Sequence, residues 1–254
     1  MALIREARAE TEARRRRMPI SALERIAGTL PAAQDFAAAL SAPGLSVIAE
    51  MKARTPLMGV LAERYSPAGL ARTYAGAGAA ALSVLAQETS FGGRPEHLAE
   101  ARAASALPVL RKDFVTDEYQ VVEARAFGAD AVLLIVAALG SDRLRELLAA
   151  VRRLGMEALV EVHDASEVEA ALSAGARVVG VNHRDLRTFA VDTGLTAELR
   201  SMVPSPCLLV AESGIADAGD ARRLRRAGAD AVLVGEALMR SPDPATKIRE
   251  LSVP

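Results

Sequence analysis

Four short apolar runs along the chain begin with the same phrase, a glycine and an alanine followed by small and branched side chains. The phrases start at Gly78, Gly128, Gly175 and Gly228. Each follows a stretch rich in Ala, Arg and Leu, so each glycine is predicted to end a helix in the left-handed conformation that glycine adopts at low cost. The apolar run after each glycine is predicted to be a strand that is buried on both faces.

The repeat interval indicates how many strands the chain contains. The four phrases stand about fifty residues apart, which is enough for two βα units, and a second apolar run lies in each interval or just before the first. The predicted strands span residues 45–51, 81–85, 108–112, 131–136, 157–162, 177–182, 207–211 and 231–235. Helical patterns such as 142–154 and 216–227 fill the gaps.

Strands that alternate with helices form parallel βαβ units, and eight such units that close on themselves form a (β/α)8 or TIM barrel. We therefore predict an α/β fold in which residues 45–254 form one such barrel. A doubly wound open sheet is the alternative, but that fold usually carries a glycine-rich loop after its first strand. This chain has Lys52-Ala-Arg-Thr-Pro at that point.

Residues 1–44 precede the first predicted strand and contain one or two helical patterns, with breaks at Pro19, Pro31 and Pro43. This segment is too short for a core of its own. We expect a helical extension that packs on the barrel within a single domain of residues 1–254. Its basic run, residues 14–17, is predicted to be a solvated helix face balanced by nearby acidic residues, which are Glu6, Glu10 and Glu12.

Composition narrows the class of protein. Hydrophobic residues make up 51% of the 254 residues and charged residues 25%, and the net charge of −1 gives no basic footprint for nucleic acid. The single cysteine, Cys207, excludes a disulfide within the chain and favours a reducing compartment. No apolar run is long enough to span a bilayer, and the N-terminus lacks the apolar core of a signal peptide. We expect a cytoplasmic protein without a membrane partner.

Polar side chains gather at the predicted C-terminal ends of the strands, where barrels of this kind carry their active sites. They are Glu50 and Lys52, Lys112, Glu161, Asn182 and Arg184, Glu212 and Ser213, and Glu236. One charge at a strand end is explained by contact with water. The whole set, from different strands, predicts a ring of acid, base and anion-binding groups.

The three histidines add little to this ring. His163 and His183 follow two of the strands and are predicted to be exposed loop residues, and His97 is predicted to lie on a helix surface. No Ser-His-Asp arrangement and no metal site is predicted. Acid–base chemistry would then depend on Lys and Glu, whose pKa values would have to be tuned toward neutrality by burial and neighbouring charges.

The loops after the last two strands are the usual phosphate site of this fold. Here they contain Glu212-Ser213-Gly214 and Gly235-Glu236. Gly214 and Gly235 would let backbone N–H groups approach an anion, helped by the N-terminus of a following helix. A phosphorylated substrate is the natural inference.

Six phrases run in order along nearly the whole chain, as residues 46–52, 110–115, 158–163, 180–186, 210–214 and 233–239. Together they resemble the indole-3-glycerol phosphate synthase family of tryptophan biosynthesis. The resemblance implies that 1-(2-carboxyphenylamino)-1-deoxyribulose 5-phosphate closes its ring, loses carbon dioxide and then water, and gives indole-3-glycerol phosphate. It implies no metal or organic cofactor. We expect a monomer, and the sequence does not indicate any partner among the pathway enzymes.

The resemblance also implies roles for single residues. Lys112 would be the general acid that protonates the carbonyl, and Glu161 the acid or base of dehydration. Lys52 would be a second cation near the phosphate and carboxylate, with a part in later proton transfer. Glu50 and Asn182 would orient Lys112 and the substrate hydroxyls. The remaining contacts are implied to be Glu212, Ser213, Thr55 and Glu236 as polar groups, Arg184 as an anion ligand, Gly214 and Gly235 as the phosphate cradle, and Phe91 and Phe114 as walls for the aryl ring.

Two loops depart from the family pattern. Thr55-Pro56-Leu57 stands where Ser-Pro-Ser is usual, and Leu85-Ala-Gln-Glu-Thr replaces Leu-Thr and an acid. A paralogue that acts on a modified anthranilate is therefore one alternative. The others are a different phosphate-binding barrel enzyme, such as a phosphoribosyl isomerase or a Schiff-base lyase, and a non-catalytic barrel that serves as a binding partner.

Overall fold

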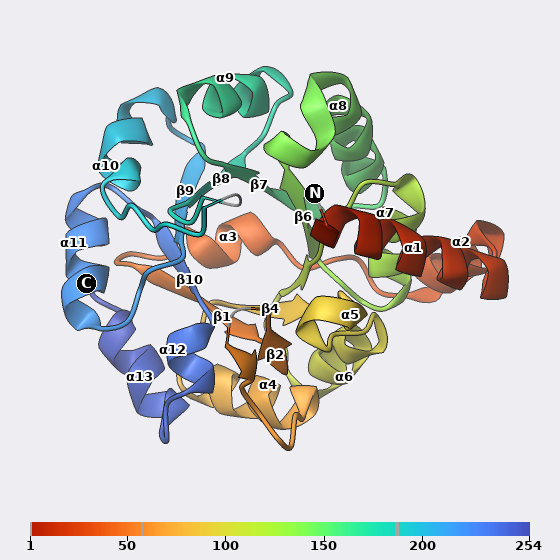
Figure 1. Ribbon diagram of the computed structural model, residues 1–254, viewed down its shortest axis with the longest axis horizontal. Coiled ribbons are helices and arrows are strands. Elements are labelled where there is room, and N and C mark those ends of the chain that lie inside the picture. The colour runs from red at the N-terminus through yellow and green to blue at the C-terminus, as the bar shows by residue number, and fades with distance from the viewer. Residues whose placement is uncertain (1, 57, 186–187) are drawn as a thin grey trace.

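Eight parallel strands close into one barrel in the computed structural model, which describes residues 2–56, 58–185 and 188–254 (Figure 1). The strands are β1 (Ser46–Met51), β4 (Ala81–Leu85), β5 (Val109–Lys112), β6 (Ala131–Ile135), β7 (Glu157–Val162), β8 (Val178–Asn182), β9 (Leu208–Glu212) and β10 (Ala231–Val234). The last strand pairs with the first, Ala231 opposite Ser46. The predicted barrel is confirmed, and each predicted strand is correct to within one residue at either end.

Helices surround the ring of strands (Figure 1). They are α4 (Pro67–Gly76), α5 (Glu88–Phe91), α6 (Glu96–Ala104), α7 (Glu118–Ala126), α8 (Val136–Arg153), α9 (Ala165–Ser173), α10 (Leu195–Leu199), α11 (Ala218–Arg226), α12 (Glu236–Met239) and α13 (Pro244–Leu251), with a 3-10 turn at Arg200–Met202. The four repeated glycines end helices with φ between 84° and 93°, which confirms the predicted left-handed caps. A short antiparallel pair, β2 (Arg54–Thr55) and β3 (Gly59–Val60), projects from the loop after β1.

Two similar clamps hold the N-terminal ends of the strands. Asp130, just before β6, accepts a hydrogen bond from the Val109 N–H (2.9 Å) and pairs with Arg102 (3.2 Å). Asp230, just before β10, accepts one from the Leu209 N–H (2.8 Å) and also pairs with an arginine (3.4 Å). β6 and β10 lie opposite each other in the ring. The repeated Gly-Ala-Asp phrase therefore ties each of these strands to its neighbour.

Apolar side chains fill the barrel and the layer between strands and helices. α3 (Phe36–Leu40) covers the N-terminal end of the barrel, because Phe36 and Leu40 are fully buried against interior residues such as Ile48 and Leu159. Burying an aromatic and a leucine in this position stabilises the fold by about 3–6 kcal/mol. The C-terminal end of the barrel has no such plug among the described elements, and it opens into a cavity.

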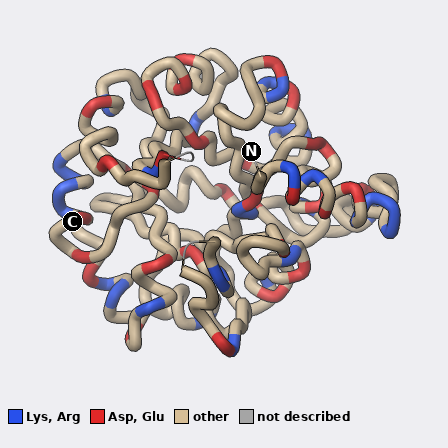
Figure 2. The backbone as a smooth tube through the Cα atoms, in the orientation of Figure 1, with Lys and Arg blue, Asp and Glu red and all other residues tan. Residues whose placement is uncertain are grey.

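Three helices, rather than the predicted one or two, precede β1. α1 (Ala2–Arg17) begins over the barrel mouth and runs outward, followed by α2 (Ile20–Thr29), which packs on α7 (Figure 1). The prediction of a wholly solvated basic face was wrong for Arg14, whose Nε lies 2.7 Å from the buried carboxylate of Glu123. Around the rest of the molecule, Lys and Arg alternate with Asp and Glu on the outer helices (Figure 2). None of the described helices is long and apolar enough to cross a membrane.

Candidate active site

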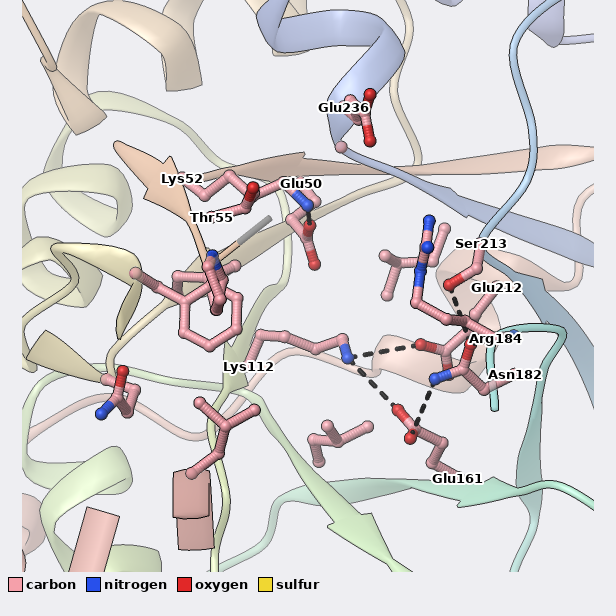
Figure 3. Close-up of a pocket in the computed structure, with 18 of the residues that line it drawn as sticks. Glu50, Lys52, Thr55, Lys112, Glu161, Asn182, Arg184, Glu212, Ser213 and Glu236 are labelled. Atoms are coloured by element: carbon pink, nitrogen blue, oxygen red, sulfur yellow. Dashed lines mark hydrogen bonds and ion pairs between the residues drawn. The ribbon is translucent and has the colours of Figure 1, made fainter. Parts of the chain in front are cut away.

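A cavity of about 430 Å³ opens at the C-terminal ends of the strands, within the size range of small-molecule sites (Figure 3). Its lining includes every residue predicted for the site, namely Glu50, Lys52, Thr55, Phe91, Lys112, Phe114, Glu161, Asn182, Arg184, Glu212, Ser213, Gly214, Gly235 and Glu236. The barrel therefore brings these residues together, although they are spread over most of the chain.

A layer of four ionisable side chains lies at the top of the barrel interior. Glu50, Lys112, Glu161 and Glu212 come from β1, β5, β7 and β9, which are alternate strands of the ring. Alternate strands supply the side chains of one interior layer in this fold, and that layer is usually apolar. Here three buried carboxylates surround one ammonium. Gly180 of β8 makes room for this layer, because a Cβ atom there would overlap the Glu212 carboxylate.

Lys112 is the centre of the layer. Its Nζ lies 3.3 Å from Glu161 Oε2 and 3.4 Å from Glu212 Oε2 (Figure 3). Burial alone would lower the pKa of Lys112, but the charges of Glu161, Glu212 and Glu50 outweigh it and raise the pKa above its ordinary value. The expectation that this lysine is tuned toward neutrality was therefore wrong. It is held as an ammonium ion.

The two carboxylates beside Lys112 differ in proton affinity. Burial raises the pKa of Glu212 to about 7, with Glu161 and Glu50 adding to the effect and Lys112 opposing it. The pKa of Glu161 is lowered, because Lys112, His163 and the Asn182 amide outweigh its burial. One carboxyl is thus poised to hold a proton near neutral pH, as expected of an acid–base group, while the other is held as a carboxylate.

Among the described residues, Lys112 pairs with Glu161 and Glu212, while Glu50 and Asn182 bond to other groups of the layer and Glu50 acts on Lys112 through its charge. Glu50 Oε1 lies 2.5 Å from Lys52 Nζ, because residues i and i+2 of a strand point to the same side. Asn182 donates from Nδ2 to Glu161 Oε1 (3.1 Å) and accepts from the Ser213 hydroxyl (2.8 Å). Asn182 therefore fixes the position of the Glu161 carboxylate, which in turn contacts Lys112.

The loops after β8, β9 and β10 are shaped by close approaches. Ser213 and Gly214 both have left-handed backbones, with φ of 69° and 72°. Such a conformation in a serine stores strain, which is typical of functional sites. At Gly235, an added Cβ atom would overlap Glu50 Oε1 and lie 2.9 Å from Lys52 Nζ. Gly235 therefore lets the backbone approach the charged groups closely, whereas Gly214 makes room for the Val191 and Thr193 side chains of the loop after β8.

Apolar side chains also line the cavity. Besides the predicted Phe91 and Phe114, sequence reasoning missed a set of lining residues that are Leu3, Met58, Leu133, Ile135, Phe189, Ile215 and Leu233. Strand alternation could have indicated the members from β6 and β10. Leu3 carries no local signal, because it comes from the start of α1, far from the strands in sequence.

The same helix holds the loop after β4, one of the two loops that depart from the family pattern. The Glu10 carboxylate accepts hydrogen bonds from the N–H groups of Glu88 (3.1 Å) and Thr89 (2.8 Å). The Gln87 side chain donates to it as well (3.0 Å), and Gln87 lines the cavity. In the other departing loop, Thr55 Oγ1 accepts from the Met58 N–H at 3.0 Å. Leu57 lies outside the described residues, and so does Leu186, the last residue of the phrase 180–186.

The histidines are less exposed than predicted. His97 and His183 are buried, and the ring of His183 lies between the Ser213 carbonyl (2.9 Å) and the Thr196 hydroxyl (2.7 Å). His163 is partly buried between Glu161 and Glu167. The prediction was wrong because residues distant in sequence cover two of these rings, such as Tyr65 beside His97 and Thr196 beside His183. Among the described residues, no group of three or more His, Cys, Asp or Glu is arranged to hold a metal ion.

The fold and the cavity together define a (β/α)8 barrel with buried acid–base groups at its mouth. A family model of indole-3-glycerol phosphate synthase matches residues 2–251, and the chain belongs to that family. Indole-3-glycerol phosphate synthase 2 of Streptomyces coelicolor is 59% identical over 98% of this chain and 96% of its own length. The indole-3-glycerol phosphate synthase of Roseiflexus castenholzii is 50% identical over 96% of this chain and 94% of its own. The resemblance found in the sequence is confirmed.

Solved structures of lower identity share the fold. A 3-hexulose-6-phosphate synthase has a TM-score of 0.64 at 16% identity, covering 82% of this chain and 98% of its own. A thiamine phosphate pyrophosphorylase from Pyrococcus furiosus has a TM-score of 0.62 at 18% identity, covering 82% and 93%. These similarities are evidence for the barrel alone.

Proposed function

We propose that this chain closes the indole ring of 1-(2-carboxyphenylamino)-1-deoxyribulose 5-phosphate and forms indole-3-glycerol phosphate, carbon dioxide and water. The observation that carries the proposal is the single ammonium of Lys112, held between Glu161 and Glu212 at the base of the cavity. Ring closure generates negative charge on a carbonyl oxygen, and a fixed cationic donor stabilises that charge.

In this mechanism the first step is attack on the ketose carbonyl by the ring carbon that carries the carboxylate. Lys112 donates its proton to the carbonyl oxygen as the new bond forms. Its raised pKa does not oppose this step, because the developing alkoxide is a stronger base than the amine. The aryl ring lies against Phe91 and Phe114, which line the cavity. Loss of carbon dioxide returns the electrons of the C–C bond to the ring.

Dehydration then requires a base and an acid on the same intermediate. Glu161, which is held as a carboxylate, removes a proton from this intermediate. A protonated group gives its proton to the departing hydroxyl, which leaves as water. Glu212 and Lys52 are the two candidates for this acid. Glu212 suits the role because burial raises its pKa to about 7. Asn182 and Glu50 act on these groups: Asn182 orients Glu161, and Glu50 holds Lys52.

The substrate's phosphate and carboxylate require cations and N–H donors. Lys52 and Arg184 supply the charge, and Gly214 and Gly235, which line the cavity, are the positions whose backbone N–H groups cradle the phosphate in this proposal. Thr55, Ser213 and Glu236 are the polar contacts at the rim. Glu236 also lies 3.6 Å from Arg240, which balances its charge near an anion site.

The purified protein and the aryl-amino ketose phosphate test the proposal directly. We expect an indole absorbance and fluorescence signal together with one equivalent of carbon dioxide. Borohydride added during turnover should trap no covalent adduct on Lys112 or Lys52, whereas a Schiff-base lyase would give one. Competition between the plain substrate and ring-substituted analogues tests the paralogue alternative, because a strong preference for an analogue would show a modified anthranilate to be the substrate.

We also propose that the chain acts as a monomer in the cytoplasm on this single phosphorylated substrate, without nucleic acid or a membrane, and that residues 1–44 extend the barrel of residues 45–254 within one domain. The contacts of α1 with the cavity support the single domain, since Leu3 lines it. Sedimentation of the active protein measures the oligomeric state, and a dimer at assay concentration would overturn that part of the proposal.

A further inference from the structure

His163 follows β7 directly and lies beside Glu161, two residues earlier in the chain. Its Nε2 is 3.5 Å from Glu161 Oε1, and its Nδ1 is 3.2 Å from Glu167 Oε2 on α9. Nε2 is buried and has no hydrogen-bond partner among the described residues. The ring therefore bridges two carboxylates, one at the centre of the site and one on the outer helix.

We propose that His163 is a positioning residue whose protonated ring sets the charge and orientation of Glu161, with Glu167 holding the ring in place. The inference rests on the proposed function, because it assigns a helper to the base of that reaction. A doubly protonated imidazole offers one N–H to each carboxylate, whereas a neutral ring must present a bare nitrogen to one of them.

Helix capping alone does not explain the arrangement. Glu167 does accept a hydrogen bond from the backbone N–H of His163 (2.8 Å), and this contact helps to start α9. That role accounts for the Glu167 carboxylate but not for the buried Nε2 that faces the active site. At Glu161, Lys112 occupies Oε2 and Asn182 donates to Oε1. His163 is thus a second cationic group directed at the same carboxylate.

The charges around His163 favour its protonated form. Glu161 faces it from β7, Glu212 from β9, and Glu167 and Asp164 from the start of α9, while Lys112 lies beyond Glu161. Burial lowers the pKa of His163, but its hydrogen bond to Glu167 and the charges of Glu161, Glu167 and Glu212 outweigh burial and raise it. The charge of His163 in turn contributes to the lowered pKa of Glu161.

The pH dependence of kcat/KM tests this role. In His163→Gln the acidic limb, where Glu161 gains its proton, should move to higher pH by about one unit, the size expected when one nearby opposite charge is removed. Glu167→Gln keeps an acceptor for the His163 N–H and should move the limb in the same direction by a smaller amount. Glu169→Gln removes a charge from an exposed position of the same helix and should leave the limb unchanged.

A second measurement requires no substrate. The imidazole of His163 is titrated by NMR in the natural protein and in Glu161→Gln. The midpoint of its titration should be lower in the variant, because a facing carboxylate is lost. Equal midpoints, or superimposable pH profiles for His163→Gln and the natural protein, would overturn the inference. If His163→Gln does not fold, Glu167→Gln and the NMR titration decide the question. Failure of the natural protein to form product would instead overturn the proposed function, while a falling midpoint would still support the His163–Glu161 coupling.

Discussion

The two lysines of the cavity occupy similar places and have different surroundings. Their side chains are almost equally exposed, 17% for Lys112 and 15% for Lys52, and each follows or ends a barrel strand. Lys112 lies between two carboxylates, whereas Lys52 contacts one, Glu50, beside the backbone of Gly235. The number of buried carboxylates around a lysine, rather than its depth, therefore distinguishes the lysine proposed to protonate the ketose carbonyl from the one proposed to lie beside the substrate anions.

The difference also sets the charge of each side of the site. Around Lys112 there is one carboxylate in excess, and the excess is relieved when Glu212 holds a proton, consistent with its pKa of about 7. Around Lys52 the charges already balance, so a substrate anion must compete with Glu50 for the ammonium. Four substitutions test this comparison.

The largest effect is expected from Lys112→Ala. Without the proton donor, kcat should fall by about 10²- to 10⁴-fold while the protein stays folded. Stopped-flow or steady-state indole fluorescence measures the rate, and circular dichroism measures the fold. The matched control is Lys247→Ala on α13, whose only described ionic partner is Glu250 on the same helix, and it should retain the natural rate. Comparable rates for the two variants would remove the distinction between the lysines.

Glu161→Gln should lower kcat by about 10²- to 10³-fold, because the amide keeps the size of the side chain but cannot accept the proton. KM should change little, since the cations that bind the anions remain. Product formation under saturating substrate measures this. The control is Glu157→Gln. Glu157 lies at the opposite end of the same strand and pairs with Arg177 at 2.5 Å. A rise in KM at constant kcat would show that Glu161 contributes to binding only.

Gly235→Ala tests the Lys52 side. Its new Cβ atom would overlap the Glu50 carboxylate and displace Lys52, so KM should rise about tenfold with a smaller change in kcat. Initial rates over a range of substrate concentrations separate the two parameters. An alanine at Gly28 of α2 meets nothing within 4 Å and should leave both unchanged. If kcat falls in the first variant more than KM rises, Lys52 belongs with the proton-transfer groups.

The smallest effect concerns stability. Burial raises the pKa of Glu212 to about 7 from its ordinary value of 4.5. The folded protein then binds this proton more tightly than the unfolded chain, so its contribution is present below about pH 4.5 and is lost as pH rises through about 7. Glu212→Gln should remove that loss, and its unfolding free energy should decline less than that of the natural protein between pH 5 and pH 8, by about 1 kcal/mol or more.

Urea denaturation at the two pH values measures the difference. Glu250→Gln on α13 provides the control, since its side chain is 47% exposed. Parallel pH dependence in the natural protein and Glu212→Gln would mean that ionising Glu212 beside Glu161 does not lower the free energy of unfolding.

Much of the fold was predictable because its signals lie in short stretches of the sequence. The glycine caps, the β-branched runs and the fifty-residue interval of the repeat each depend on a few neighbouring residues, and the strand ends placed Lys112, Glu161 and Glu212 in one ring. The site could be located for the same reason, since strand ends in a closed barrel all meet at one face.

The remaining features depend on which distant segments meet. Nothing near Leu3 or Glu10 indicates that α1 reaches the mouth and holds the loop after β4. The burial of His183 arises from Thr196 and the Ser213 carbonyl, which the chain supplies later. The pairing of Glu50 with Lys52, rather than with Lys112, required side-chain distances that periodicity does not provide.

The clamps of Asp130 and Asp230 bear on how such a protein can change over time. They bind the strands at the end of the barrel that lies away from the cavity, and they stand on opposite sides of the ring. Substitutions far apart in a structure affect stability almost independently. Substitutions in the loops at the mouth can therefore change the chemistry without weakening the clamps at the other end of the barrel. The residues that maintain the fold and those that carry the activity can then evolve separately.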